Sequence, residues 1–198
     1  MLDICLLGTG GMMPMPSRFL TAMLARLNGR LALIDCGEGT QVTMKMLGWG
    51  FKAIDVICFT HFHADHISGL PGLLLTIGNA GRTEPLMLIG PVGLQRIVEG
   101  LTLIAPELPF PIEYIELTQD APNPIRVGAF EIHHCPADHM VKCFAYRIDL
   151  KRKGKFDVKK AEQLKLPKPL WNKLQKEGSV EHEGKTYTAD MVMGENRK

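Results

Sequence analysis

The sequence predicts an α/β fold built on a mixed sheet, and two observations support this class. Apolar, strand-like runs alternate with helical segments as far as residue 118, and beyond that point strands follow one another. The run AIDVICFTH (53–61) is almost continuously apolar, which is typical of a strand buried on both faces. A chain of 198 residues with 45% hydrophobic and 7% aromatic residues is long and apolar enough for one full domain, or for one domain with an appendage.

The first quarter of the chain predicts a strand, a hairpin and a helix. A strand is expected over 2–9, and residues 10–18 form a loop rich in glycine and proline. Residues 20–27 and 31–37 predict two strands joined at Asn28-Gly29, because both residues tolerate the positive φ angles of a tight hairpin turn. Residues 40–47 predict a helix with Thr40 as its N-cap.

The middle of the chain continues with strands and helices in turn. After the strand over 53–61, a helix is expected over 67–79, with Pro71 near its start. The remaining predicted elements are a strand over 85–91, a helix over 92–104, and strands over 112–118, 125–135 and 143–150.

Cysteine usage and the N-terminus predict the compartment. The cysteines are widely spaced, odd in number and mostly within apolar runs, which is typical of buried free thiols in a reducing compartment: Cys5, Cys36, Cys58, Cys135 and Cys143. The N-terminal residues lack the basic segment of a signal peptide, and no run of eighteen apolar residues occurs. We therefore expect a cytoplasmic protein without a membrane partner.

The net charge of +2 hides a strong asymmetry. Residues 1–150 carry 10 basic and 14 acidic side chains, whereas residues 151–176 carry 10 basic and 2 acidic ones. A lysine run is often a solvated face, but clustered cations also bind phosphates by releasing counterions, and charge alone favours neither interpretation. The candidate RNA-binding residues are Lys151, Arg152, Lys153, Lys155, Lys159 and Lys160.

A dense group of metal-binding side chains follows the buried strand. His61 and His63 are two residues apart at the strand end, so both project from the same side. Asp65 and His66 lie in the turn beyond and supply an oxygen and another nitrogen. Four ligands exceed what one tetrahedral ion with an open position needs, and they suit two ions that share a hydroxide. The alternative is a polar turn with a fortuitous histidine cluster.

These motifs resemble a known family. THFHADH (60–66) matches the signature of the metallo-β-lactamase superfamily, and together with LGTGG (7–11), DCGEGTQ (35–41) and the extension ISGLPGLL (67–74) it is similar to the ribonuclease Z family. Residues 154–180 also resemble the arm, or exosite, with which that family grips tRNA. There this chain has Lys168-Pro169 where the family usually has Gly-Pro.

The resemblance implies an αββα sandwich with a basic, flexible arm near the C-terminus. Residues 1–150 would form the catalytic body, as the first half of the sandwich, and residues 151–198 the tRNA-binding arm and tail. Since the sequence resembles roughly the first two-thirds of a family member, we expect little of the second sheet. Apolar runs such as LALI (31–34) and VICF (56–59) would then face water on one side and drive pairing into a homodimer.

The resemblance also implies roles for individual residues. His61 and His63 would hold one zinc with a third histidine, and His133, His134 and His139 are the candidates. His139 is preferred, because Phe144-Ala145-Tyr146 follows it at the spacing of the family's Phe-Gly-Tyr.

Asp65 and His66 would bind a second zinc, and Asp65 would accept a proton during the attack on the substrate. Asp35 would orient a ligand histidine, or else be a simple turn residue before Gly37.

The implied activity is zinc-dependent removal of the 3′ trailer from precursor tRNA by metal-activated water. The family has two further ligands downstream of the arm, an aspartate and a histidine. After His139 this sequence has one further histidine, His182, in a predicted hairpin, and Asp190 fits the role of the aspartate poorly. We therefore expect one zinc per chain, where the family holds up to two, and weak or absent hydrolysis. The rival interpretations are a lactone or thioester hydrolase of the same superfamily and a non-catalytic tRNA-binding protein.

Overall fold

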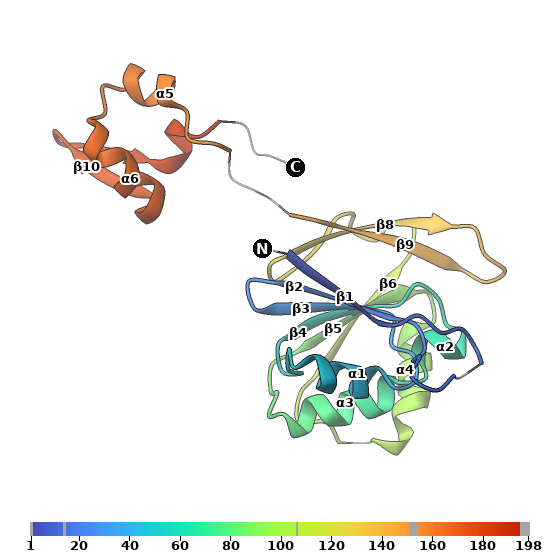
Figure 1. The fold of residues 1–198 in the computed structure, drawn as a ribbon. Coiled ribbons are helices and arrows are strands. Elements are labelled where there is room, and N and C mark those ends of the chain that lie inside the picture. Colours follow the sequence, from blue (N-terminus) through green and yellow to red (C-terminus); the bar gives the residue numbers. More distant parts are fainter. Residues whose placement is uncertain (1, 14, 106, 151–153, 195–198) are drawn as a thin grey trace. The chain divides into compact units, whose positions relative to one another are not determined.

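The chain folds into two compact units, residues 1–148 and 149–198 (Figure 1). The computed structural model describes residues 2–13, 15–105, 107–150 and 154–194. The division falls two residues before the boundary expected from charge, at 150/151. The functional labels of the two units stay predictions.

The first unit is organised around a six-stranded mixed sheet, as the sequence predicted. Its strands lie side by side in chain order: β1 (Leu2–Gly8), β2 (Ala22–Leu27), β3 (Arg30–Ile34), β4 (Ile54–Cys58), β5 (Leu86–Pro91) and β6 (Ile112–Leu117). The pairs β1–β2 and β2–β3 are antiparallel, and the remaining pairs are parallel. Asn28 (φ 52°) and Gly29 (φ 79°) form the β2–β3 turn, which confirms the predicted hairpin.

Helices cover one face of this sheet. Figure 1 shows α1 (Thr40–Leu47), α3 (Leu70–Asn79) and α4 (Leu94–Leu101) on the same side, where they bury Met44, Leu73 and Val98 in one core. The N-cap of α1 and the extent of two other helices differ from the sequence predictions. The N-cap of α1 is Gly39, and Thr40 already lies in the helix, its hydroxyl donating to the Gly37 carbonyl (2.7 Å).

The other difference concerns two helices that were each predicted as one continuous element. The helix predicted over 67–79 begins only at Leu70, as α3, because Ile67 is the last residue of a separate short helix, α2 (Ala64–Ile67). The segment predicted as a helix over 92–104 ends in the 3₁₀ turn η1 (Thr102–Ile104). Gly69 separates α2 from α3. Its amide donates to the Cys36 carbonyl (2.9 Å), and a Cβ at Gly69 would meet the Gly37 carbonyl oxygen at 2.1 Å. The contact between these two loops therefore ends α2.

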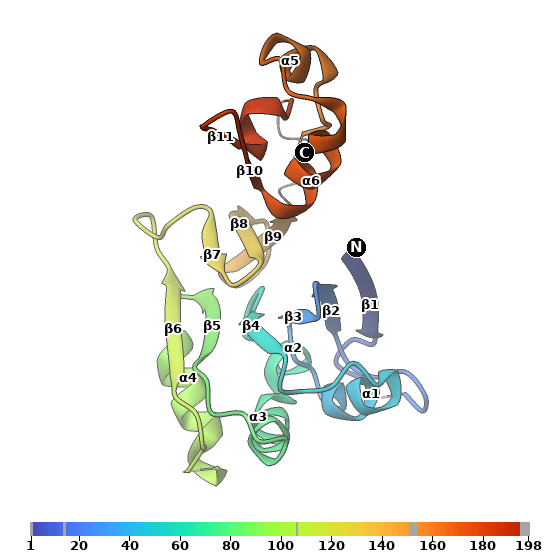
Figure 2. The same cartoon turned by 90° about the vertical axis from the view of Figure 1, so that its left-hand side faces the viewer.

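A second sheet covers the opposite face, which corrects one prediction. The strands β7 (Ile125–Val127), β8 (Phe130–Ala137) and β9 (Cys143–Asp149) form a three-stranded sheet (Figure 2). Its Phe130 and Ile132 are buried in one core with Val56 and Ile89 of the first sheet. The runs 31–34 and 56–59 are therefore covered on both faces, and the prediction that one of their faces meets water is wrong. Exposed apolar side chains on this side of the sheet lie on β1, where Ile4 is 60% and Leu6 is 65% exposed.

The second unit has a small core of its own. It contains α5 (Val158–Gln163), α6 (Lys168–Glu177), the hairpin β10 (Ser179–His182) and β11 (Lys185–Thr188), and the 3₁₀ turn η2 (Ala189–Val192). The buried side chains of its core are Ala161, Leu166, Leu174, Val180 and Val192. The hairpin predicted around His182 is confirmed. Lys168, which stands where the family usually has glycine, is the first residue of α6. Pro169, which the family shares, lies in the first turn of this helix, where proline is well tolerated because its missing N–H would be unpaired there anyway.

The cysteines are free, as predicted, but only some of them are buried. All five are free; Cys36 and Cys58 are buried, but Cys135 is exposed. Burial raises the pKa of the Cys36 thiol to about 12. Within the described residues, no helix is long and apolar enough to cross a membrane.

Candidate metal centre

Three histidines meet where β4 ends. His61 lies in the turn that leaves β4, and His63 is the N-cap residue of α2, with extended backbone. His139 comes from the loop between β8 and β9, 78 positions further along the chain than His61. The segment that follows β4 therefore provides His61 and His63, and the loop between two strands of the second sheet provides His139.

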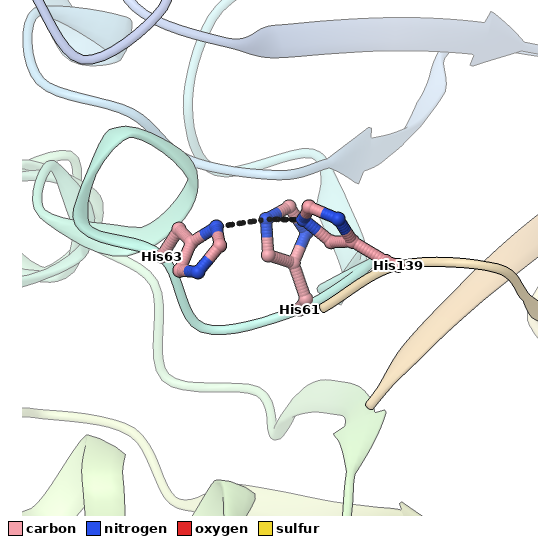
Figure 3. Close-up of side chains that lie close together, drawn as sticks. All are labelled: His61, His63 and His139. Atoms are coloured by element: carbon pink, nitrogen blue, oxygen red, sulfur yellow. Dashed lines mark hydrogen bonds between the residues drawn. The ribbon is translucent and has the colours of Figure 1, made fainter. Parts of the chain in front are cut away.

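The three rings point their nitrogens at one another (Figure 3). His61 Nε2 lies 3.0 Å from His63 Nδ1 and 3.2 Å from His139 Nε2. Nitrogens held ~2.0–2.1 Å from one tetrahedral zinc ion would be separated by roughly 3.3 Å, so these distances fit a shared ion. Among the described residues, this is the group of histidine, cysteine and acidic side chains whose donor atoms lie within 4.8 Å of one another. The donor set therefore fits a metal.

Hydrogen bonds from β9 bring the second sheet to this position. The amide of Phe144 donates to the Thr60 carbonyl (2.9 Å), and the hydroxyl of Tyr146 donates to the Phe59 carbonyl (2.8 Å). Both acceptors immediately precede His61, so β9 is fixed beside the metal-binding turn and the loop with His139 reaches it. Burial raises the pKa of the Tyr146 hydroxyl, which therefore stays protonated and can donate. In the sequence, Phe144-Ala145-Tyr146 served only to choose among the candidate histidines, and these hydrogen bonds were not predicted.

Asp35 connects the end of β3 to the same turn. Asp35 is only 2% exposed, and its carboxylate accepts hydrogen bonds from His66 Nδ1 (2.8 Å), the Thr60 amide (2.8 Å) and the Thr60 hydroxyl (2.8 Å). The residue also adopts φ 59° ahead of Gly37. Asp35 is therefore a turn residue whose carboxylate also contacts His66, and its role in orienting a metal ligand stays a prediction.

Close backbone packing places Asp35 within reach of His66. The amide of Cys36 donates to the His66 carbonyl (2.7 Å). A Cβ at Gly37 would meet the Asp65 carbonyl oxygen at 2.4 Å, so only glycine fits there. The glycine of the DCGEGTQ motif is therefore explained by the approach of two loops.

The surroundings of His61 and His66 shift the pKa values of these two histidines in opposite directions. Burial, together with the neighbouring histidines His66, His139 and His63, lowers the pKa of His61 to about 4, so its ring is neutral near pH 7 and offers a lone pair. Burial also favours a lower pKa for His66. The hydrogen bond to Asp35 and the negative charges of Asp35 and Asp65 outweigh burial, so the pKa of His66 is raised.

The remaining predicted ligands lie beside the cluster but do not join it. The His66 ring centroid is 4.1 Å from that of His61, and His66 Nε2 is 3.7 Å from an Asp65 carboxylate oxygen. Neither residue belongs to the three-histidine group. A second ion at Asp65 and His66 stays a prediction.

The structure also separates the three candidates for the third histidine. His139 is in the cluster, whereas His133 and His134 lie on β8 and outside it. His133 Nε2 is 3.9 Å from a carboxylate oxygen of Glu131, and His134 Nε2 is 3.2 Å from the Pro122 carbonyl oxygen. The Phe-Ala-Tyr spacing therefore selected the histidine that meets His61.

An open groove of about 1020 Å³ runs from His139 along the second sheet. Its wall includes Gln119, Asn123, His134 and Lys142, together with apolar side chains from the ends of β5 and β6. A substrate lying in this groove would pass the histidine cluster at His139.

The predicted RNA-binding side chains belong to the second unit. Lys155, Lys159 and Lys160 are exposed, whereas Lys151, Arg152 and Lys153 lie outside the described residues. Lys160 Nζ donates to the Met193 carbonyl (2.9 Å), so part of its hydrogen-bonding capacity is used within the unit. Among the residues of this unit that the structure describes, the exposed lysines are Lys155, Lys159, Lys160, Lys165, Lys168, Lys173, Lys176 and Lys185.

Comparisons with known proteins place this site in a family. A family model described as anti-Pycsar protein Apyc1 matches residues 2–98. Proteins named ribonuclease Z from Lachnospira eligens and Agathobacter rectalis are each 56% identical over 198 residues, which is 100% of this chain and 65% of theirs. Ribonuclease Z of Clostridium botulinum is 45% identical over 211 residues, covering 100% of this chain and 67% of the relative.

Solved structures show the same fold. The short form of human tRNase Z superposes with a TM-score of 0.66 at 30% identity, covering 76% of this chain and 65% of that one. The metallo-β-lactamase fold protein YhfI from Bacillus subtilis superposes with a TM-score of 0.61 at 22% identity, covering 75% and 58%. The first unit is thus a metallo-β-lactamase fold, with a histidine cluster at the end of β4.

Within this fold class, the relatives that match the whole chain identify the family. The chain belongs to the ribonuclease Z family. It spans 65% of the length of the relatives from L. eligens and A. rectalis.

Proposed function

We propose that this chain carries the zinc centre and tRNA-binding unit of an endoribonuclease that removes the 3′ trailer from precursor tRNA. The observation that carries the proposal is the convergence of His61, His63 and His139 in a chain whose relatives are named ribonuclease Z. Three imidazole nitrogens with room for a fourth ligand are the donor set of a catalytic zinc. A bound zinc would supply a hydroxide near neutral pH and a positive charge for the scissile phosphate.

In this proposal, one side chain takes a proton from the attacking water and another holds a histidine in place. Asp65, beside His66, accepts a proton from the attacking water, and Asp35 holds His66 in place through Nδ1. The groove past His139 receives the RNA strand. A second ion held by Asp65 and His66 is part of the family's chemistry, whereas three nitrogens at one site support one zinc per chain.

The test of the reaction is cleavage of a 3′-extended precursor tRNA, end-labelled and mapped on a sequencing gel, with zinc content measured on the same sample. We expect slow cleavage at the junction of the tRNA body and its trailer, and none for His63→Ala. Zinc-dependent hydrolysis of lactones or thioesters without any RNA cleavage would contradict the proposal. Zinc and tRNA binding with no cleavage at any enzyme concentration would favour the non-catalytic alternative.

The lysines of the second unit would bind the tRNA body. Replacing Lys155, Lys159 and Lys160 with alanine should weaken tRNA binding roughly tenfold and lower the slope of log affinity against log salt by about one unit for each phosphate that is no longer neutralised. Alanine at Lys45 and Lys52, which are exposed lysines of the first unit, is the matched control and should change neither value. Unchanged binding by the triple variant would mean that these lysines are only a solvated face.

Assembly and location remain predictions. The exposed Ile4 and Leu6 on β1 offer apolar surface for pairing with a second copy into a homodimer, in the cytoplasm. Light scattering should give twice the chain mass, and Leu6→Glu should shift the equilibrium toward monomer. A wild-type monomer at high concentration would contradict the pairing.

A further inference from the structure

The hydroxyl of Thr60 lies between the buried carboxylate and the metal-binding turn. Thr60 Oγ1 is 2.8 Å from Asp35 Oδ2 and 2.9 Å from His61 Nδ1. Both distances are normal for strong hydrogen bonds, so the hydroxyl makes both at once. His61 Nδ1 is the ring nitrogen that faces away from His63 and His139. Thr60 therefore contacts His61 on the side opposite to the proposed metal.

Counting protons fixes the direction of these two bonds. A hydroxyl has a single proton to donate, and an ionised carboxylate has none. If the Thr60 proton were directed at His61, two oxygens would face each other at 2.8 Å with no proton between them. The hydroxyl therefore donates to Asp35 and accepts from His61, which must carry its proton on Nδ1.

His66 obeys the same constraint through a direct contact. Its Nδ1 lies 2.8 Å from Asp35 Oδ2 and so donates to the carboxylate. The Thr60 amide also donates to Asp35, at 2.8 Å from Oδ1, which keeps the hydroxyl in register with the carboxylate. One buried carboxylate thus acts on two histidines, directly on His66 and through a hydroxyl on His61.

We propose that Thr60 is a positioning residue that transmits the influence of Asp35 to His61, holding the His61 proton on Nδ1 and leaving Nε2 free as a metal ligand. Within the described part of the chain, His61 Nδ1 also lies 4.0 Å from the Cys143 sulfur, which is a far weaker acceptor than the hydroxyl. The three-histidine cluster is therefore prepared for a metal before any ion arrives.

The experiment compares wild type, Thr60→Val and Thr60→Ser in the metal-free and zinc-titrated states. Valine keeps the shape but removes the hydroxyl, and serine keeps the hydroxyl. Long-range proton–nitrogen correlation spectra of the metal-free proteins, assigned with a His61→Gln variant, report which ring nitrogen carries the proton. Zinc affinity is measured by competition with a chelator.

We expect His61 of the wild type and of Thr60→Ser to show a protonated Nδ1 and an unprotonated Nε2. Thr60→Val should lose this preference and bind zinc about 10–100-fold more weakly, as is typical when a residue that orients a metal ligand is removed, while Thr60→Ser stays close to wild type. His66 should keep its protonated Nδ1 in all three proteins, because it contacts Asp35 directly.

A wild-type His61 protonated on Nε2 would overturn the proposal, and so would a Thr60→Val protein that keeps both tautomer and affinity. If the valine variant fails to fold, the wild-type and serine spectra still decide the tautomer. The affinity measurement rests on the zinc site proposed above, but the tautomer does not. A wild type with the expected tautomer and no zinc binding would therefore reject the proposed function alone.

Discussion

The two units of this chain use polar residues in opposite ways. In the first unit, the side chains of Asp35, His61 and Arg82 are almost fully buried, and each makes directed hydrogen bonds or close ring contacts. In the second unit, the described lysines are exposed around a core of five buried residues. The chemistry of the first unit therefore depends on precise tertiary placement, whereas that of the second depends on surface charge held by a small scaffold. Four substitutions test this contrast.

The largest effect is expected at Arg82 in the first unit. Its guanidinium donates to the backbone carbonyls of Lys52, Ile54, Glu84 and Pro85, joining the loop after α3 to the segment that begins β4. Arg82→Met leaves these acceptors without their donor, at a cost of about 4–6 kcal/mol in unfolding free energy. Urea titration of the variant measures this loss, and the exposed Arg96→Met is the control. A loss below about 1 kcal/mol would show that water replaces the guanidinium.

The next effect separates the two units. Leu174 is fully buried in the core of the second unit, so Leu174→Ala should cost about 2–5 kcal/mol there. Because the first unit has its own cores, amide exchange should accelerate in α5, α6 and β10 and stay slow in β3 and β4. Leu174→Met nearly conserves volume and should cost less than about 1.5 kcal/mol. Faster exchange throughout the chain would mean that the two units unfold together.

The metal centre comes third. His139→Ala removes one of three nitrogens and should lower zinc affinity at least about 100-fold, or about 2.7 kcal/mol, without unfolding the first unit. His134→Ala removes a histidine of the same second sheet that lies outside the cluster, and it should keep near one zinc per chain. Equal affinities in the two variants would show that His139 is not a ligand.

The smallest effect is expected at the start of α5. Asp157 caps this helix by accepting from the Lys160 amide (3.2 Å), so Asp157→Ala should cost about 1 kcal/mol, confined to the second unit. Asp157→Asn keeps a capping oxygen and should be nearly neutral. Thermal melting with a probe on Trp171, which lies in this unit, follows both variants. No difference between alanine and asparagine would mean that the cap does not contribute.

Local signals in the sequence determined much of the fold. The near-continuous apolar run before His61 predicted a buried strand, because a strand covered on both faces needs apolar side chains on both. Asn28-Gly29 predicted the β2–β3 turn, because the conformation of a tight turn depends mainly on its own residues. The same signals failed where a distant segment intervened. Gly69 ends α2 because a loop more than thirty residues earlier in the sequence packs against it, and no helical pattern contains that information.

The candidate site also has features that local sequence predicted and features that depend on distant segments. The spacing of His61 and His63 after a strand was enough to predict two metal ligands on one side, since strand geometry repeats every second residue. The spacing to Phe144-Ala145-Tyr146 already favoured His139 as the third histidine, and the structure places it in the cluster. Only the tertiary structure decided that Tyr146 and Phe144 hold β9 against the turn, and that Thr60 links His61 to Asp35. These contacts join residues that are far apart in the chain, and their hydrogen bonds have direction. The sequence alone therefore specified which side chains were available, whereas the packing of two sheets specified which nitrogen each histidine presents.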